Sequence, residues 1–97
     1  MKVPEFKLAL VPVTEEARAV GFRGRVAADL GKRHKIGGDP DYMQRSDVPN
    51  CPSCGEAMSF YAQLDSVGDG YWIADCGLVY VFLCFDCFES ASFVQSA

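Results

Sequence analysis

The sequence predicts a small α+β domain that is predominantly antiparallel β and holds a four-cysteine zinc site formed by two Cys-x-x-Cys knuckles. The two motifs, residues 51–54 and 84–87, are separated by 29 residues. The segments between them have the alternating or continuous apolar pattern of β-strands. Near the N-terminus, a threonine followed by acidic residues and then a glycine is typical of one short helix.

Length and composition indicate a single domain that spans residues 1–97. With 97 residues, 49% of them hydrophobic, the core alone gives the fold only marginal stability, and a bound metal ion would add to it. The first residues, MKVPEFKLAL, lack the basic start, apolar block and cleavage site of a secretory signal, which predicts a cytoplasmic location. The most apolar stretch, 71–85, includes an aspartate and is shorter than the roughly 20 residues of a membrane-spanning helix. We therefore expect this stretch to lie in the core of the domain and not in a membrane.

The N-terminal third has weaker patterns. Residues 6–11 place large apolar side chains at alternate positions before Pro12, which predicts a strand. Thr14 offers an N-cap and Gly21 a stop for a short helix. The segment 22–35 fits either a second strand or an irregular turn. Gly-Gly-Asp-Pro at 37–40 has the composition of a turn.

Beyond residue 49 the pattern becomes clearly β. Apolar and polar side chains alternate from Met58 to Asp65, with Leu64 in the apolar series, as expected for a half-exposed strand. The uninterrupted apolar run 78–83 predicts a strand buried on both faces. Turn-forming residues at 65–70 can reverse the chain between these strands, and residues 93–95 predict a last short strand.

The cysteines of the two motifs lie at the ends of the predicted strands. Cys51 and Cys54 come just before the first strand, and Cys84 and Cys87 come just after the second. If the strands pair antiparallel, all four sulfurs meet at one end. Zinc favours a tetrahedron of soft ligands, and each knuckle offers two thiolates. We therefore predict that these four cysteines bind one structural Zn2+ in a zinc ribbon-like site, although the gap is longer than the usual 15–20 or so residues.

Other chemistry finds less support in the sequence. Cys51-Pro-Ser-Cys54 could be a redox dithiol, but a strand pattern follows it where such a motif needs a helix start. Cys76 is predicted to be a buried core thiol, because an extended strand would place it about 26 Å from Cys84. His34 has cationic neighbours and is interpreted as part of a solvated basic turn. Because four cysteines close the coordination sphere, we predict no enzymatic activity.

The charge is divided unevenly along the chain. All nine Lys and Arg lie in residues 1–50 together with seven acids, whereas residues 51–97 carry six acids and no Lys or Arg. The two halves therefore have net charges of +2 and −6, and four thiolates with one Zn2+ would take the second half to −8. Nucleic-acid affinity comes largely from Lys and Arg that neutralise phosphates, so we do not expect nucleic-acid binding.

Four segments carry a resemblance to a known family. They read HKIGGDPDYMQ (34–44), CPSCGEAMSFYAQLD (51–65), ADCGLVYVFLCFDC (74–87) and FVQ (93–95). Together they resemble the YwqG-like family of bacterial proteins of unknown function, over residues 34–97, with residues 1–33 as an N-terminal strand and short helix outside it. The resemblance implies the same four cysteine ligands and the motif residues Gly37, Gly38, Pro40, Gln44, Gln63 and Gln95. A more distant similarity, to the eukaryotic programmed cell death protein family of ribosomal-protein chaperones, implies protein binding.

These observations favour a zinc-stapled protein-binding module, chaperone-like or an adaptor, whose acidic second half meets a basic protein client. An equally ranked alternative is that residues 18–45 of the same chain neutralise the acidic half, or that this half only aids solubility. A zinc module that binds nucleic acid, and a Cys-x-x-Cys redox protein, rank lower. The nucleic-acid alternative would use the basic residues of the 32–45 segment, which are Lys32, Arg33, His34, Lys35 and Arg45.

Overall fold

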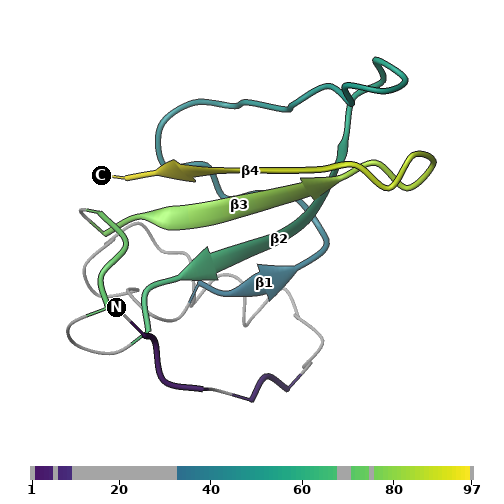
Figure 1. Cartoon of the computed structure of the whole chain (residues 1–97). Helices are drawn as coiled ribbons and strands as arrows, with labels where there is room; N and C mark the ends of the chain where they lie inside the picture. The colour runs from purple at the N-terminus through teal and green to yellow at the C-terminus, as the bar shows by residue number, and fades with distance from the viewer. Residues whose placement is uncertain (1, 6, 10–32, 68–70, 75, 97) are drawn as a thin grey trace.

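A four-stranded antiparallel sheet organises the described part of the chain. The computed structural model describes residues 2–5, 7–9, 33–67, 71–74 and 76–96. The strands are β1 (Lys35–Ile36), β2 (Ser59–Asp65), β3 (Leu78–Leu83) and β4 (Ser90–Gln95). They lie in the order β1-β2-β3-β4, so each strand pairs with its neighbour in the sequence (Figure 1). Each connection therefore needs only a loop that reverses the chain.

The three longer strands agree with the patterns in the sequence. The β3 strand covers the predicted residues 78–83, and β2 begins one residue after the predicted start at Met58. The antiparallel pairing of β2 with β3, on which the predicted site depends, is confirmed. The β4 strand is longer than the predicted 93–95 segment, because Ser90 to Ser92 also pair with β3.

The α part of the predicted α+β class is not supported, since the described residues contain no helix. The helix predicted from Thr14 lies outside the described residues, and so does most of the ambiguous segment 22–35. The strand predicted at 6–11 is wrong for residues 7–9, which are exposed and have no strand partner. An alternating pattern alone does not make a strand without a neighbouring edge to accept its hydrogen bonds.

A β-bulge in β2 changes which side chains face the core. Phe60 pairs with Phe82, but Ala62 pairs with Val81, so one extra residue is accommodated between them at Tyr61. Because side chains alternate between faces, one extra residue reverses the alternation beyond it. The sequence pattern would put Leu64 on the apolar side with Phe60. Instead Leu64 is exposed, and the polar residues on either side of it are buried.

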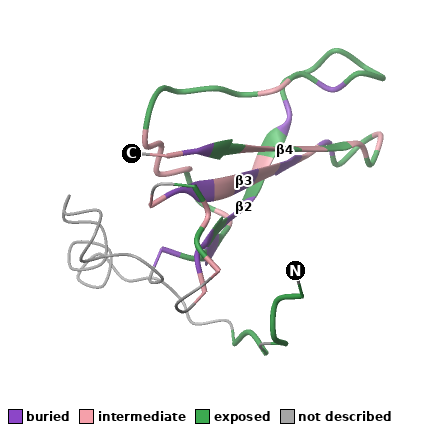
Figure 2. Cartoon of the chain, turned by 60° about the vertical axis from the view of Figure 1, so that its left-hand side comes forward, coloured by how far each residue is buried: buried purple, intermediate pink, exposed green. Residues whose placement is uncertain are grey.

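The core lies on one face of the sheet and extends toward the cysteines. Leu78, Tyr80 and Phe82 of β3 are almost fully buried, and they cluster with Met58 and with two of the cysteines. Buried and half-buried residues, purple and pink in Figure 2, alternate along β3. Phe93 of β4 packs beside them, with its ring centroid 5.4 Å from that of Tyr80 and 5.7 Å from that of Phe82. The prediction that β3 is buried on both faces is wrong, because its alternate residues are only half-buried.

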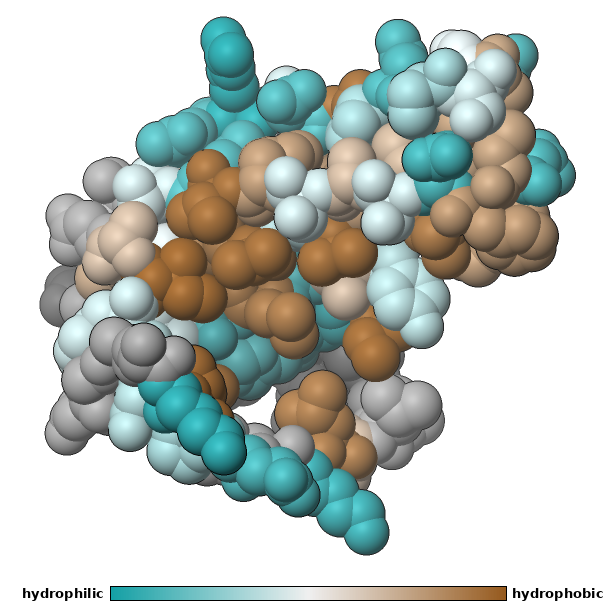
Figure 3. Space-filling model, viewed as in Figure 1, coloured by the Kyte–Doolittle hydropathy of each residue, from teal (hydrophilic) through white to brown (hydrophobic). Residues whose placement is uncertain are grey.

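The opposite face of the sheet carries a band of aliphatic side chains, which crosses the sheet in the view of Figure 3. Ile36, Leu64 and Val94 are 49%, 38% and 51% exposed. Half-buried residues of β3 lie between them: Val79, Val81 and Leu83. Both faces of the sheet therefore carry apolar side chains, but the core face is more deeply buried than the other.

Two buried glutamines hold the loop that covers the core face. The Gln63 side chain accepts a hydrogen bond from the Asp41 amide at 2.9 Å. On the edge strand β4, the Gln95 side chain accepts a hydrogen bond from the Met43 amide at 3.0 Å and donates one to the Arg45 carbonyl at 2.7 Å. Backbone groups that irregular structure would leave unpaired are thereby satisfied by side chains.

Candidate metal centre

The first knuckle comes immediately before β2. The Gly55 amide donates to the Cys51 carbonyl, and the Cys51 amide donates to the Glu56 carbonyl, both at 2.8 Å. Gly55 has a φ of 79°, which a glycine adopts without strain. The Ser53 amide points at Cys51 Sγ, 3.4 Å away. The short turn therefore directs two cysteines to the same side and offers an N–H donor to one sulfur.

The second knuckle follows β3 and repeats this backbone pattern. The Phe88 amide donates to the Cys84 carbonyl, and the Cys84 amide donates to the Glu89 carbonyl, again at 2.8 Å. The Cys87 amide lies 3.4 Å from Cys84 Sγ. Phe88 occupies the position that Gly55 has in the first knuckle, and its φ of 58° is also left-handed.

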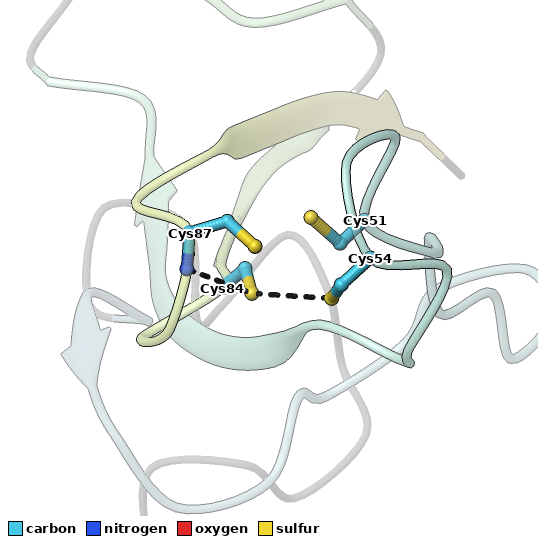
Figure 4. Close-up of side chains that lie close together, drawn as sticks. All are labelled: Cys51, Cys54, Cys84 and Cys87. Carbon is cyan, nitrogen blue, oxygen red and sulfur yellow. Dashed lines mark hydrogen bonds between the residues drawn. The ribbon is translucent and has the colours of Figure 1, made fainter.

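The antiparallel pairing of β2 with β3 brings the knuckles together. Ser59, at the start of β2, pairs with Leu83, at the end of β3, so both knuckles emerge at the same end of the sheet (Figure 1). The sulfurs of the four predicted cysteines all lie within 4.8 Å of one another, and Figure 4 shows them converging from two loops. All four thiols are free.

The distances suit one tetrahedral metal ion. Sulfurs that each lie about 2.3 Å from a central zinc are about 3.8 Å apart in a regular tetrahedron. Cys54 Sγ and Cys84 Sγ, which belong to different knuckles, are 3.8 Å apart. A disulfide would need about 2.05 Å. The four thiols can therefore hold a metal ion without rearrangement of the strands.

The thiols differ in pKa because they make different hydrogen bonds. The pKa of Cys51 is lowered to about 7, mainly because the Cys54 amide stabilises its thiolate. The pKa of Cys87 is raised to about 12, chiefly through its contact with the Cys54 side chain and also through burial. Without a cation, the cluster favours one thiolate and resists further ionisation. A divalent metal ion removes that resistance, because it binds and neutralises thiolates.

The site forms one end of the core. Cys51 and Cys84 are buried and belong to the core cluster, whereas Cys87 is half-buried and Cys54 is exposed. A metal ion held by four protein ligands has no open position for a substrate or an activated water. A metal ion bound by all four cysteines would therefore be closed to other ligands.

Two other residues considered in the sequence lie apart from the sulfur cluster. The prediction of a buried core thiol at Cys76 is wrong, because Cys76 is half-buried in a turn with a φ of 56°. Its carbonyl accepts a hydrogen bond from the Arg33 guanidinium at 3.1 Å. His34 is exposed, as expected, and its Nδ1 accepts from the Asp65 amide at 3.0 Å.

The basic segment is less available than its sequence indicates. Arg33 is 5% exposed and forms an ion pair with Asp65, with 2.8 Å between Nε and Oδ2. Lys35 is 8% exposed and pairs with Asp41 at 2.8 Å. Sequence reasoning missed these buried pairs because their partners are distant along the chain or lie within the loop. Lys32 lies outside the described residues.

The implied motif residues have structural roles around the loop. Gly37 and Gly38 have φ values of 77° and 71°, which the turn after β1 requires. Gln63 and Gln95 hold the loop as described above, and Gln44 donates to the Ser96 carbonyl at 3.0 Å. Pro40 is half-buried within the loop. In the part of the chain that the structure describes, no hydrogen bond joins any of these residues to the four sulfurs.

Among the described residues, no helix has the length and apolar character needed to cross a membrane.

Comparisons with known proteins give a limited similarity. No family model matches the chain, so the resemblance to the YwqG-like family stays a prediction. No solved structure matches it either. The chain is 33% identical over 63 residues to an uncharacterized protein, YpfL, of Salmonella typhimurium. The match covers 63% of this chain but only 14% of that relative, so the chain is similar to a small part of a larger protein of unknown function.

Proposed function

We propose that Cys51, Cys54, Cys84 and Cys87 bind one structural zinc ion. The observation that carries this proposal is the convergence of four thiols, within 4.8 Å of one another, from two matching knuckles. Tetrahedral sets of four sulfurs favour zinc or iron, so the metal must be identified directly. Because all five cysteines are free, we also propose a reducing, cytoplasmic location.

Elemental analysis of freshly purified, reduced protein tests the site. We expect one zinc per chain, lost in Cys51→Ser and Cys87→Ser and retained in Cys76→Ser, which serves as the matched control because Cys76 lies outside the sulfur cluster. Iron instead of zinc would give visible absorption and correct the metal assignment. The absence of stoichiometric metal, or equal loss in all three variants, would contradict the proposed ligands.

We further propose that the zinc-stapled domain is a protein-binding module, an adaptor or chaperone-like protein, for a basic client. Three acids lie at or beside the knuckles: Glu56, Asp86 and Glu89. Arg33 pairs with Asp65 at the other end of β2, and Lys35 pairs with Asp41 of the loop. The site itself would add a net charge of −2 when four thiolates hold a divalent ion. This end of the domain therefore attracts cations and repels phosphates.

Within the described part of the chain, one ion pair joins the basic segment to the acidic half. The Arg33–Asp65 pair joins the two halves of the chain, as the alternative interpretation expects. That pair, however, lies at the opposite end of β2 from the knuckles. The same pair removes a cation from the set available to nucleic acid, and Lys35 is likewise committed to Asp41. Protein binding is therefore favoured over nucleic-acid binding.

A binding panel distinguishes these functions. Zinc-loaded protein is titrated with single-stranded and duplex nucleic acid and with basic proteins, at low and at physiological salt. We expect binding to basic proteins that weakens as salt screens the charges, and none to nucleic acid. Micromolar, salt-sensitive binding to nucleic acid that is lost on replacing Lys32 and the exposed Arg45 with Ala would overturn the proposal.

A further inference from the structure

We propose that the second knuckle, residues 84–89, is the docking site for a partner protein segment that combines Arg or Lys with apolar side chains. In this assignment Phe85 and Phe88 make the apolar contacts, and the acids beside them pair with the cations. The inference rests on the proposed protein-binding function and locates its contact surface.

Phe88 is the residue that neither the fold nor the metal site explains. It is 77% exposed, the highest value among the large hydrophobic residues that the structure describes. Its φ of 58° is left-handed, a conformation that is unfavourable for a side chain with a Cβ. The first knuckle places Gly55 at the same position, with the same amide-to-carbonyl hydrogen bond. A glycine therefore suffices for the knuckle, whereas the phenyl ring adds strain and exposed apolar area.

The same turn carries a second exposed aromatic side chain. Phe85, three residues earlier in the same turn, is 56% exposed. Its ring centroid lies 6.5 Å from that of Tyr61, the bulged residue of β2, which is 43% exposed. The bulge therefore presents Tyr61 beside Phe85 of the knuckle. Exposed aromatics gathered at one end of a molecule are typical of protein contact surfaces, which are rich in Tyr and Phe.

Three acids lie on the same two knuckles as these aromatic residues. Asp86 is exposed between Phe85 and Cys87, and Glu89 accepts a hydrogen bond from the Ser53 hydroxyl of the other knuckle at 3.3 Å. Glu56 is exposed on that knuckle. A cation beside an aromatic face and a carboxylate gains from both, and a guanidinium can stack on the ring while it pairs with the acid. The patch therefore fits a segment with Arg or Lys next to an apolar side chain.

The probe is a displayed library of random peptides, about 12 residues long, which suffices for a groove-binding or loop-binding segment. The library is selected against the zinc-loaded full chain. We expect enriched sequences that combine Arg or Lys with Leu, Phe or Tyr. The affinity of the strongest synthetic peptide is then measured by fluorescence anisotropy, and it should fall as salt is raised.

Two variants test the assigned residues, and one serves as a control. Phe85→Ser and Phe88→Gly should each weaken binding by about 30-fold, as loss of a central contact residue does. Val94→Thr removes a 51% exposed apolar residue from the outer face of the sheet, at the far end of β4 from the knuckle, and should change affinity by less than about twofold. Phe88→Gly should keep full zinc content and an unchanged or higher melting temperature, because Gly55 occupies the matching position.

The outcomes separate this site from the proposed function. Enriched basic peptides whose affinity is unchanged in Phe85→Ser and Phe88→Gly would overturn the docking site and leave protein binding standing. Enriched peptides without Arg or Lys, or no enrichment, would overturn both. A large loss of melting temperature in Phe88→Gly would show that the phenyl ring serves the fold, which also contradicts the proposal.

Discussion

Tyr80 shows how a single buried side chain joins the sheet to the loop that covers it. Its ring is fully buried and lies between Tyr42 of the loop and Phe93 of β4. Its hydroxyl donates to the Asp41 carbonyl at 2.8 Å, which satisfies a polar group that the core could not otherwise accommodate. Burial raises the pKa of Tyr80 to about 12.

The raised pKa predicts an alkaline loss of stability that Tyr80→Phe removes. The folded protein holds the phenol proton up to about pH 12, whereas the unfolded chain releases it near pH 10. This contribution is therefore complete below pH 10 and is lost as the pH rises toward 12. At pH 8, Tyr80→Phe should be less stable by about 1–2 kcal/mol, because the Asp41 carbonyl loses its donor.

The measurement is urea unfolding of both proteins at several pH values. The stability gap between the wild-type chain and Tyr80→Phe should narrow between pH 10 and 12. A constant gap over this range would contradict the effect assigned to burial.

At the scale of the element, each strand is set by contacts that the local pattern only partly reveals. The limits of β3 could be predicted because six successive apolar residues fit a buried strand. The inward position of Gln63 could not, because the bulge at Tyr61 depends on pairing with β3 rather than on the residues of β2. Likewise, the Arg33–Asp65 pair joins residues 32 positions apart, beyond the reach of local periodicity.

The turn into β3 depends on a glycine for space. An added Cβ at Gly77 would lie 2.7 Å from the Ile73 carbonyl oxygen and 3.0 Å from the Gln95 carbonyl oxygen. Both atoms belong to the backbone and cannot move aside without disturbing the turn or β4. Gly77→Ala should therefore destabilise the protein by about 2–3 kcal/mol.

Gly37→Ala provides the comparison for Gly77→Ala in chemical denaturation. An added Cβ at Gly37 meets nothing within 4 Å, and only its φ of 77° opposes it. We expect a loss of about 1 kcal/mol there. Equal losses of stability in the two variants would show that the backbone around Gly77 moves enough to accommodate the added Cβ.

The loop over the core should behave as an ordered element although it is not a strand. Because the Asp41 and Met43 amides donate to buried glutamine side chains, their hydrogen exchange should be slow. In Gln95→Ala, exchange at Met43 should accelerate at least about tenfold while Asp41, held by Gln63, changes little. Amide exchange measured by NMR distinguishes this from a loop that opens as one unit, in which both amides would accelerate together.

At the scale of the whole molecule, one sheet separates a closed core from an aliphatic outer face and ends in four thiols. The convergence of those thiols could be predicted, because Cys-x-x-Cys motifs flank two strands that pair antiparallel. The exposure of Phe85 and Phe88 could not be predicted from hydrophobicity, which assigns such residues to the core. Aligning the two knuckles would have revealed Phe88 opposite Gly55.

Metal binding should release protons in a pH-dependent number. Because the pKa of Cys51 is about 7, its thiol is largely protonated at pH 6 and largely ionised at pH 8 in the metal-free protein. Zinc binding at pH 8 should therefore release about one proton fewer than at pH 6, and affinity should rise with pH. Calorimetry in buffers of different ionisation enthalpy counts these protons. The same count at both pH values would contradict the lowered pKa of Cys51.

Because the knuckles lie at the ends of paired strands, a bound metal ion would favour the correct register of β2 against β3. A slip of β2 by one residue against β3 would turn Gln63 to the outer face and shift the first pair of sulfurs by about 3.3 Å relative to the second. Coordination distances tolerate only about 0.2 Å. Only the correct register brings all four sulfurs together, so metal binding would stabilise the native pairing relative to misaligned hairpins that bury similar apolar surface.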